Sequence, residues 1–362
     1  MTTELGRLIA RRIALTGPIS LADFMAEALG HPRLGYYRYA LPVGAAGDFT
    51  TAPEISQMFG ELSGAWLAER WLAMGRPPSV RLVELGPGRG TLMADALRAT
   101  RGVPGFHAAI DLHLVEINEQ LRALQDQALA LFKPTWHARF DDVPDGPVLL
   151  VANEFFDALP VRQFENTARG WVERMVGLGD DGETLRLALA PGVTPYAAAL
   201  PDAPVGAQAE ICEAGLALAG AIGERLKRFA GWALIVDYGH DGALGASLQA
   251  VRGHRGAAIL DRPGETDLSA HVDFAALARA TGRPTFGPVG QGDFLRRLGI
   301  AERARALKAR AGEAQRAAID AASARLIAPD QMGTLFRVLA VGDDRSAAPA
   351  GFSDTHRASP SD

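Results

Sequence analysis

One short stretch of the chain decides its fold class, Val83-Glu84-Leu85-Gly86-Pro87-Gly88-Arg89-Gly90-Thr91. The apolar run VRLVEL that leads into it predicts a buried strand, and the residues from Thr91 onward predict a helix. Glycines at such a junction let the backbone approach a ligand closely, and the first N–H groups of the helix add favourable dipoles. The stretch therefore predicts a ligand site at the carboxyl end of a strand.

Two classes of nucleotide cofactor bind at turns of this kind. A dinucleotide fingerprint needs glycine or alanine five residues after its first glycine, but counting from Gly86 gives Thr91, and the third glycine comes one place early. In methyltransferases the turn packs against the methionine part of S-adenosylmethionine, and an acidic residue two positions before the first glycine is typical. Glu84 occupies that position. The spacing therefore favours S-adenosylmethionine over a nicotinamide cofactor.

The ends of further strands extend the predicted cofactor site. The strand DLHLVEI ends in Glu116, whose carboxylate can accept hydrogen bonds from both ribose hydroxyls of either cofactor class. The next strand end lies near Phe140-Asp141, where we expect the adenine, although an aromatic residue after a strand is more often part of the core. The predicted cofactor-binding residues are Glu84, Gly86, Pro87, Gly88, Glu116, Phe140 and Asn153.

The fourth strand, PVLLVAN, runs into two acids that suggest the chemistry. Ligands in open α/β sheets bind beyond the carboxyl ends of the strands, so Glu154 and Asp157 are predicted to face the reacting methyl group. Two carboxylates suit an arginine guanidinium, which pairs with them bidentately, and a carboxylate can take the proton that a methylated nitrogen loses. We therefore predict Glu154 and Asp157 as catalytic residues. In the alternative interpretation the acids cap a helix, and Phe155 and Phe156 pack in the core.

After the first 76 residues, short apolar runs alternate with helical segments. This alternation predicts an α/β fold with a mostly parallel sheet. Residues 1–76 are predicted to form a helical N-terminal cap, and residues 77–342 the domain that binds the cofactor. Two insertions are predicted, at about 161–206, where two-fold patterning indicates an antiparallel hairpin, and at about 290–328. Residues 343–362 are mostly small and polar, which predicts a disordered tail.

A loop in the N-terminal part has features of a lid. It runs from Gly47 to Ser56 and carries two acids, Asp48 and Glu54, shortly before the cofactor-binding strand. Such a loop is placed to fold over the site. The simpler interpretation is that Thr51 or Ser56 caps a helix.

Composition narrows the class of protein. The 362 residues carry a formal net charge of −5 without a basic tract that alternates with aromatics, so nucleic acid is not an expected partner. No stretch approaches the roughly 20 apolar residues that span a bilayer, so membrane insertion is not expected. Cys212 is the only cysteine, the histidines show no metal-ligand spacing, and the first residues lack a secretory pattern. We therefore expect a cytoplasmic protein without disulfides or a metal site.

The motifs together resemble one known group, the MidA-like methyltransferases, which include the mitochondrial assembly factor for respiratory complex I. The matching segments run in order from about residue 16 to 342: GDFTTAPEISQMFGE, ELGPGRGTLMAD, ANEFFDALPVRQF, DYGH, DLSAHVDFAAL, QGDFLRRLGI and MGTLFRVLAVG. The resemblance implies a class I, Rossmann-like methyltransferase fold that uses S-adenosylmethionine. One departure is Ser247-Leu248-Gln249-Ala250-Val251, where many relatives carry threonine, arginine and an aromatic residue.

The resemblance also bears on the substrate. By extension from the mitochondrial member, it implies symmetric dimethylation of an arginine on a complex I subunit near the quinone site. The implied partner is this protein substrate. Separately, we expect a homodimer, in which a second copy of the chain is a partner. Two other functions fit the same motifs: a small-molecule methyltransferase with a narrow closed pocket, and an assembly chaperone that binds the cofactor without turnover. The residues alone leave these alternatives open.

Overall fold

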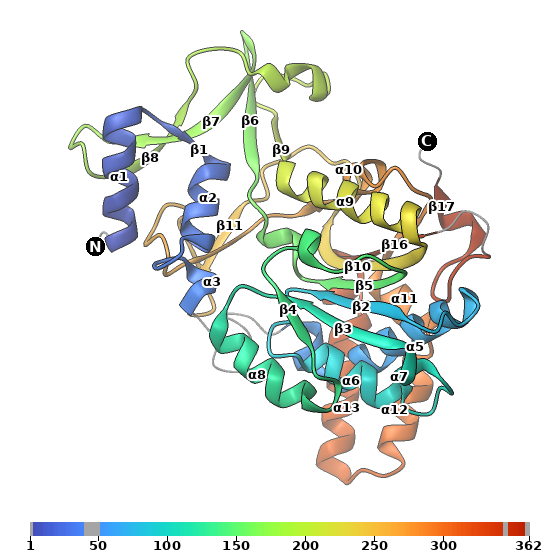
Figure 1. Ribbon diagram of the computed structural model, residues 1–362. Helices are drawn as coiled ribbons and strands as arrows, with labels where there is room; N and C mark the ends of the chain where they lie inside the picture. Colours follow the sequence, from blue (N-terminus) through green and yellow to red (C-terminus); the bar gives the residue numbers. More distant parts are fainter. Residues whose placement is uncertain (1–2, 40–50, 343–346, 359–362) are drawn as a thin grey trace. The chain divides into compact units, whose positions relative to one another are not determined.

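The computed structural model describes residues 3–39, 51–342 and 347–358 (Figure 1). Within them the chain forms two compact units. The antiparallel unit combines residues 3–39, 157–217 and 242–271, and the parallel-sheet unit combines residues 51–156, 218–241, 272–342 and 347–358. Each unit is therefore built from segments that are distant in the sequence. None of the helices in these described ranges is both long and apolar enough to cross a membrane.

A nine-stranded sheet lies at the centre of the parallel-sheet unit (Figure 1). Its strands follow the order β17, β15, β16, β10, β5, β2, β3 and β4, and β14 pairs with the end of β10. The strands β10, β5, β2, β3 and β4 pair in parallel, whereas β16, β15 and β17 pair antiparallel. The strands are β2 (Val80–Leu85), β3 (Ile110–Val115), β4 (Thr135–His137), β5 (Val148–Asn153), β10 (Gly231–His240), β14 (Val272–Asp273), β15 (Thr285–Gly290), β16 (Phe336–Val341) and β17 (Arg357–Ala358).

Helices cover both faces of this sheet, with α9 and α10 on one side and α5 and α6 on the other (Figure 1). A strand covered on both faces is mostly apolar, and β5 accordingly carries the continuous apolar run VLLVA before Asn153 and is buried throughout. The helices are α4 (Ala52–Ile55), α5 (Gln57–Ala73), α6 (Thr91–Thr100), α7 (Phe106–Ala109), α8 (Glu119–Leu129), α9 (Glu213–Phe229), α10 (Phe274–Ala280), α11 (Gln291–Arg297), α12 (Ile300–Lys308), α13 (Glu313–Ile327) and α14 (Met332–Leu335). The expected α/β architecture with a mostly parallel sheet is confirmed.

The antiparallel unit consists of helices and two small sheets. The hairpin of β6 and β7 turns between Thr167 and Gly170. Its core is formed by one face of α1, α2 and the neighbouring strands, with Phe24 and Met25 fully buried. The elements are α1 (Glu4–Thr16), β1 (Ile19–Ser20), α2 (Leu21–Gly30), α3 (Tyr36–Tyr39), β6 (Arg162–Thr167), β7 (Gly170–Leu178), β8 (Leu185–Leu189), β9 (Gln208–Ile211), β11 (Gln249–Arg252), β12 (Arg255–Ala257) and β13 (Asp267–Ser269).

The C-terminal segment departs from its predicted disorder. Residues 347–358 contain a short 3-10 helix, Asp354–His356, and the strand β17, which pairs with β15. Phe352 is 8% exposed, and its ring contacts the rings of Phe286 and Phe294. Over residues 347–358 the structure therefore differs from the predicted disorder, because the Phe352 ring packs against two other rings and β17 pairs with β15.

A buried ionic network joins three helices of the parallel-sheet unit. Glu61 on α5 accepts hydrogen bonds from Arg98 on α6, at 2.7 Å, and from Arg303 on α12, at 2.6 and 2.7 Å. Burial by itself raises the pKa of Glu61, but the hydrogen bonds and charges of Arg303 and Arg98 outweigh burial and bring the pKa below its ordinary value. The carboxylate of Glu61 thus stabilises the packing of α5, α6 and α12 only while it is ionised.

Glu61→Gln should lower the free energy of unfolding by about 1–3 kcal/mol near neutral pH, because two arginines lose their shared carboxylate. The folded-state pKa lies below the ordinary value of 4.5, so the stabilisation is present above that pH and is lost as the pH falls through the folded-state pKa. Denaturant unfolding of both proteins over a range of pH measures the difference. A difference that stays constant into the acid range would contradict this role of the charge.

Candidate active site

The predicted glycine turn joins β2 to α6. Gly86, Gly88 and Gly90 all have left-handed backbone, with φ of 60°, 53° and 82°. A Cβ atom at Gly86 would lie 2.7 Å from Cδ2 of Phe155, a distance that no side chain tolerates without movement of the ring. Both the backbone and the close contact therefore require glycine at position 86.

Two buried oxygens next to this turn have no hydrogen-bond partner in the part of the chain that the structure describes. The Glu84 side chain on β2 is 3% exposed, and among the described residues its Oε2 accepts no hydrogen bond. Burial raises the pKa of Glu84 to about 8. Asn153, at the end of β5, donates from Nδ2 to Oε1 of Glu154 at 3.1 Å, whereas its buried Oδ1 likewise has no partner in the described chain.

The two residues point in the same direction. Glu84 pairs in register with Val151, and Asn153 follows Val151 by two positions, so the side chains of Glu84 and Asn153 lie on one face of the sheet. The parallel-sheet unit thus presents two acceptor groups at the carboxyl ends of neighbouring strands. A buried acceptor without a donor is costly, and a ligand that carries N–H groups would satisfy it.

Glu116 follows the last residue of β3 and is 8% exposed. Its Oε1 accepts hydrogen bonds from the backbone N–H groups of Ile117 and Asn118, both at 2.8 Å, and its Oε2 accepts one from Nε2 of Gln125 at 3.3 Å. Burial raises the pKa of Glu116, and the hydrogen bonds together with the charge of Arg122 oppose this shift only in part. The carboxylate is therefore held in one orientation at a strand end, where the sequence places it.

Phe140, the predicted adenine contact, is buried. It begins the 3-10 helix Phe140–Asp142 and is buried, and the guanidinium of Arg225 lies 4.7 Å from its ring centroid. One face of the ring is therefore covered by Arg225. The contact with adenine stays a prediction that must use the remaining surface of the ring.

The segment after β5 has an unusual backbone. Glu154 has a φ of 51°, in the left-handed region that a non-glycine residue seldom adopts, and such strain is often found at functional sites. Its Oε1 accepts hydrogen bonds from Ala52 N at 2.9 Å and from Asn153 Nδ2. The next turn is the 3-10 helix Phe156–Ala158, so the acids do not cap an α-helix here. Asp157 begins a segment of the antiparallel unit, where it is buried and its carbonyl accepts a hydrogen bond from Ala270 N.

Asp237 is a residue of this region that the sequence analysis does not identify. It is completely buried near the end of β10, and its Oδ2 accepts hydrogen bonds from Phe155 N at 3.1 Å and Phe156 N at 3.0 Å. Its Oδ1 accepts one from Tyr238 N at 2.9 Å. Asp237 therefore fixes the turn that follows Glu154. The only signal in the sequence is an acid at the end of the buried run WALIVDYG, inside the motif DYGH.

The predicted lid is described only in part. Residues 47–50, which include Asp48, lie outside the described residues. Ala52–Ile55 form the short helix α4, and Ser56 caps α5 by accepting a hydrogen bond from Met58 N. Glu54 accepts a hydrogen bond from the hydroxyl of Thr91, at the start of α6, at 2.5 Å. Helix α4 is therefore attached to the glycine turn through Glu54 and to the end of β5 through Ala52.

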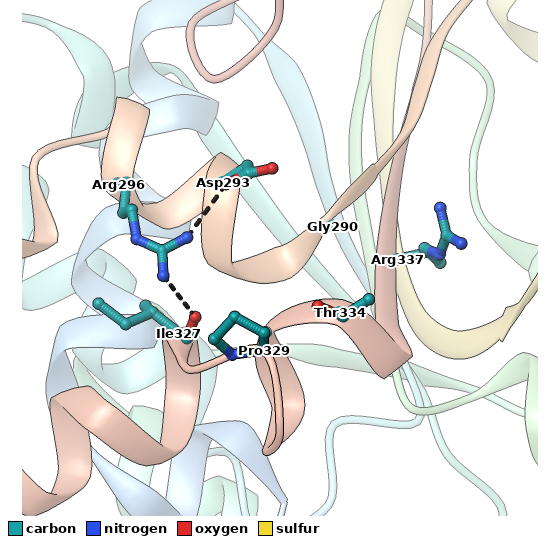
Figure 2. A pocket seen from close by; sticks show the side chains of 8 residues that line it. Gly290, Asp293, Arg296, Ile327, Pro329, Thr334 and Arg337 are labelled. Atoms are coloured by element: carbon teal, nitrogen blue, oxygen red, sulfur yellow. Dashed lines mark hydrogen bonds and ion pairs between the residues drawn. The ribbon is translucent and has the colours of Figure 1, made fainter.

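A separate cavity of about 270 Å³ opens elsewhere in the parallel-sheet unit (Figure 2). Arg296 on its wall donates to Asp293 at 3.0 Å and to the carbonyl of Ile327 at 2.7 Å. In Figure 2 the side chain of Arg337 points away from this pair. The lining residues are Gly290, Asp293, Arg296, Ile327, Pro329, Gly333, Thr334 and Arg337, and none of the predicted site residues is among them.

Comparison with known proteins agrees with this geometry. Residues 62–289 match the model of a family described as "Putative S-adenosyl-L-methionine-dependent methyltransferase", and the chain belongs to that family of S-adenosylmethionine-dependent methyltransferases. The solved structure of a Burkholderia thailandensis protein bound to S-adenosyl-homocysteine superposes with a TM-score of 0.86 at 28% identity, over 99% of this chain and 96% of the other. The class I fold and the cofactor expected from the sequence are thereby confirmed.

The curated relatives are more specific. The protein arginine methyltransferase NDUFAF7 of Mus musculus is 38% identical over 94% of this chain and 84% of its own length. The same protein of Homo sapiens is 35% identical over 94% of this chain and 83% of its own, and the Drosophila melanogaster homolog is 36% identical over 93% and 84%. The resemblance seen in the motifs therefore extends over nearly the whole chain.

The comparisons correct one expectation. The relatives are named as mitochondrial proteins, so the prediction of a cytoplasmic location is wrong. That prediction used the single cysteine, Cys212, and the lack of a secretory pattern. Neither observation discriminates among compartments in which thiols stay reduced.

Gly86→Ala should weaken the binding of S-adenosylhomocysteine at least about tenfold, because the new Cβ combines left-handed strain with a clash against Phe155. Isothermal titration calorimetry measures the affinity. Gly75→Ala is the matched control, because Gly75 also has a positive φ, of 82°, but a Cβ there meets nothing within 4 Å. The same affinity in Gly86→Ala and wild type would show that the cofactor lies elsewhere.

Proposed function

We propose that this chain is a protein arginine N-methyltransferase that uses S-adenosylmethionine. The observation that carries the proposal is the similarity, over more than nine-tenths of the chain, to proteins named as arginine methyltransferases. The acidic residues at the carboxyl end of β5 support it, since an arginine acceptor is a cation with a planar set of donors. We further propose, from the motif resemblance, that the acceptor is a respiratory complex I subunit and that it is dimethylated symmetrically. We also propose a homodimer.

The residues around the glycine turn fit S-adenosylmethionine. Its methionine part carries an ammonium group, and neither the buried Oε2 of Glu84 nor the Oδ1 of Asn153 has a donor among the described residues. A carboxyl whose pKa is raised by burial becomes a good partner for a cation, because the cation restores its charge. We propose that the cofactor is held by Glu84, Gly86, Pro87, Gly88, Glu116, Phe140 and Asn153. When bound, it supplies an electrophilic methyl group.

The proposed catalytic residues would bind and orient the acceptor. Glu154 and Asp157 are proposed to pair with the guanidinium, so that the attacking nitrogen keeps one orientation. The nitrogen that gains a methyl group must lose a proton, and a carboxylate oxygen of this pair is the proposed acceptor. The strained backbone of Glu154 and its hydrogen bond with Ala52 N support a fixed position for that carboxyl. Asp237, through Phe155 N and Phe156 N, keeps the same turn in place.

Binding of S-adenosylhomocysteine should release a proton near pH 7. The pKa of Glu84 is about 8, so the carboxyl is mostly neutral at that pH, whereas an adjacent ammonium favours its charged form. The affinity should therefore rise roughly fivefold from pH 7 to pH 8 and change less above it. Calorimetry in buffers with different heats of ionisation measures the proton directly. Glu84→Gln should abolish the release; an unchanged release in that variant would assign the proton to another group.

Glu154→Gln should reduce methyl transfer by about 10²-fold or more and leave the affinity for S-adenosylhomocysteine nearly unchanged, because the amide keeps an acceptor for Ala52 N but loses the charge. Asp157→Asn should act in the same direction. The measurement is single-turnover transfer of labelled methyl to complex I subunits, followed by amino-acid analysis for dimethylarginine. Asp126→Asn, an exposed acid on α8, is the control.

Three outcomes would contradict the proposal. Wild-type turnover in both folded variants would exclude the two-carboxylate mechanism. A wild-type protein that binds a complex I subunit and the cofactor but transfers no methyl group would instead be an assembly chaperone. Transfer to a small metabolite with no transfer to protein would identify a small-molecule methyltransferase.

A further inference from the structure

The buried face of α8 carries one polar side chain, that of Gln125. The buried residues of this helix are Leu121, Gln125 and Leu129, which are spaced by four and lie on one face. Gln125 is 0% exposed. Burial of an amide is costly unless its polar atoms are hydrogen-bonded, so an apolar residue would be the ordinary choice at this position.

The side-chain hydrogen bonds of Gln125 either point to the candidate site or fix the orientation of its amide group. Its Nε2 donates to the carbonyl of Gly88 at 2.7 Å and to Oε2 of Glu116 at 3.3 Å. Its Oε1 accepts from Nε1 of Trp136, in β4, at 2.8 Å. An indole N–H can only donate, so Trp136 determines which end of the amide carries the oxygen. The amino group of Gln125 must then face Gly88 and Glu116.

The start of α8 depends on the same carboxylate. Asn118 caps the helix by accepting from Gln120 N and Leu121 N, and its own backbone N–H donates to Oε1 of Glu116. The glycine turn also lies close to the helix, since a Cβ at Gly90 would be 3.4 Å from Cα of Gln125. Helix α8 is therefore fixed at both the strand end and the glycine turn.

We propose that Gln125 is a positioning residue for cofactor binding, which couples the glycine turn to the Glu116 carboxylate through a single amide group. This inference rests on the proposed placement of the ribose at Glu116 and of the methionine part at the glycine turn. Gln125 acts through Gly88 and Glu116 rather than through the cofactor. A ligand that spans both ends of the site then meets groups that are already ordered, which lowers the entropic cost of binding.

The amide also favours the form of Glu116 that binds hydroxyl groups. The groups that face this carboxylate are the N–H groups of Ile117 and Asn118, the amide of Gln125 and the charged Arg122. Ribose hydroxyls donate to an ionised carboxylate, so the affinity falls as Glu116 gains a proton. Loss of the Gln125 donor raises the pKa of Glu116 further, and the acid loss of affinity should then begin at a higher pH.

Gln125→Met tests the proposal, because methionine fills the same space without a donor. We expect the Kd of S-adenosylhomocysteine, measured by calorimetry near neutral pH, to rise about tenfold or more. The KM for S-adenosylmethionine should rise with it, while kcat changes by less than about threefold. Gln127→Met is the matched control, since Gln127 lies on the exposed side of the same helix. A folded Gln125→Met protein with wild-type affinity would overturn the inference.

Two further measurements separate positioning from a general packing role. Trp136→Phe keeps the ring but removes the N–H that orients the amide, so it should weaken binding less than Gln125→Met and add little to it in the double variant. In Gln125→Met, the pH at which the affinity for S-adenosylhomocysteine has fallen to half should be higher than in the wild type. The coupling would be overturned if this pH did not change and if the effects of Gln125→Met and Trp136→Phe on affinity were fully additive.

The Glu116→Ala variant distinguishes a failure of this inference from a failure of the proposed cofactor site. Wild-type affinity in Glu116→Ala would place the ribose elsewhere and remove the basis of the proposal. Weak binding in Glu116→Ala beside wild-type binding in Gln125→Met would contradict the role of Gln125 alone.

Discussion

The carboxyl edge of the parallel sheet depends on the left-handed backbone of the turn between β2 and α6. Because no side chain projects from Gly86 or Gly90, Phe155 packs against one part of this turn and the backbone of α8 against another. The end of β5 and the second half of α8 both pack against this turn. Asp237 and Gln125 then secure these two neighbours by hydrogen bonds. The site is therefore stabilised by buried polar groups that are not themselves predicted to contact the ligand. These groups hold the predicted ligand-binding acids in one orientation.

The local part of this arrangement could be predicted from the sequence. A glycine turn after an apolar run, and a carboxylate at the tip of the next strand, are patterns within a few residues of each other. The function of Asp237 could not be predicted in the same way, since its partners Phe155 and Phe156 are about 80 residues away and contribute only backbone N–H groups. Because a backbone N–H donor does not depend on the type of side chain, the residue types at these positions do not reveal the interaction. The role of Gln125 could not be predicted either, because a glutamine in a helix ordinarily indicates an exposed face.

Composition was a poorer guide where a single contact decides the outcome. Residues 347–358 contain few apolar side chains. Even so, the ring of Phe352 contacts the rings of Phe286 and Phe294, and β17 adds a strand to the sheet. The division of the chain into two units could not be predicted from hydrophobic periodicity either, because each unit contains segments that are more than 100 residues apart. Family resemblance supplied the fold and cofactor class, whereas the contacts that organise the site had to come from the structure.

The discontinuous build of the antiparallel unit has a consequence for synthesis of the chain. The hydroxyl of Thr3, which caps α1, donates to the carbonyl of Pro263, 260 residues later. During translation, α1 and α2 are made before β6, β7 and the 242–271 segment, which complete the apolar core around them. Contacts of such sequence separation slow folding and prolong the exposure of apolar surface. We therefore expect the apolar faces of α1 and α2 to need chaperone protection while the chain is being made.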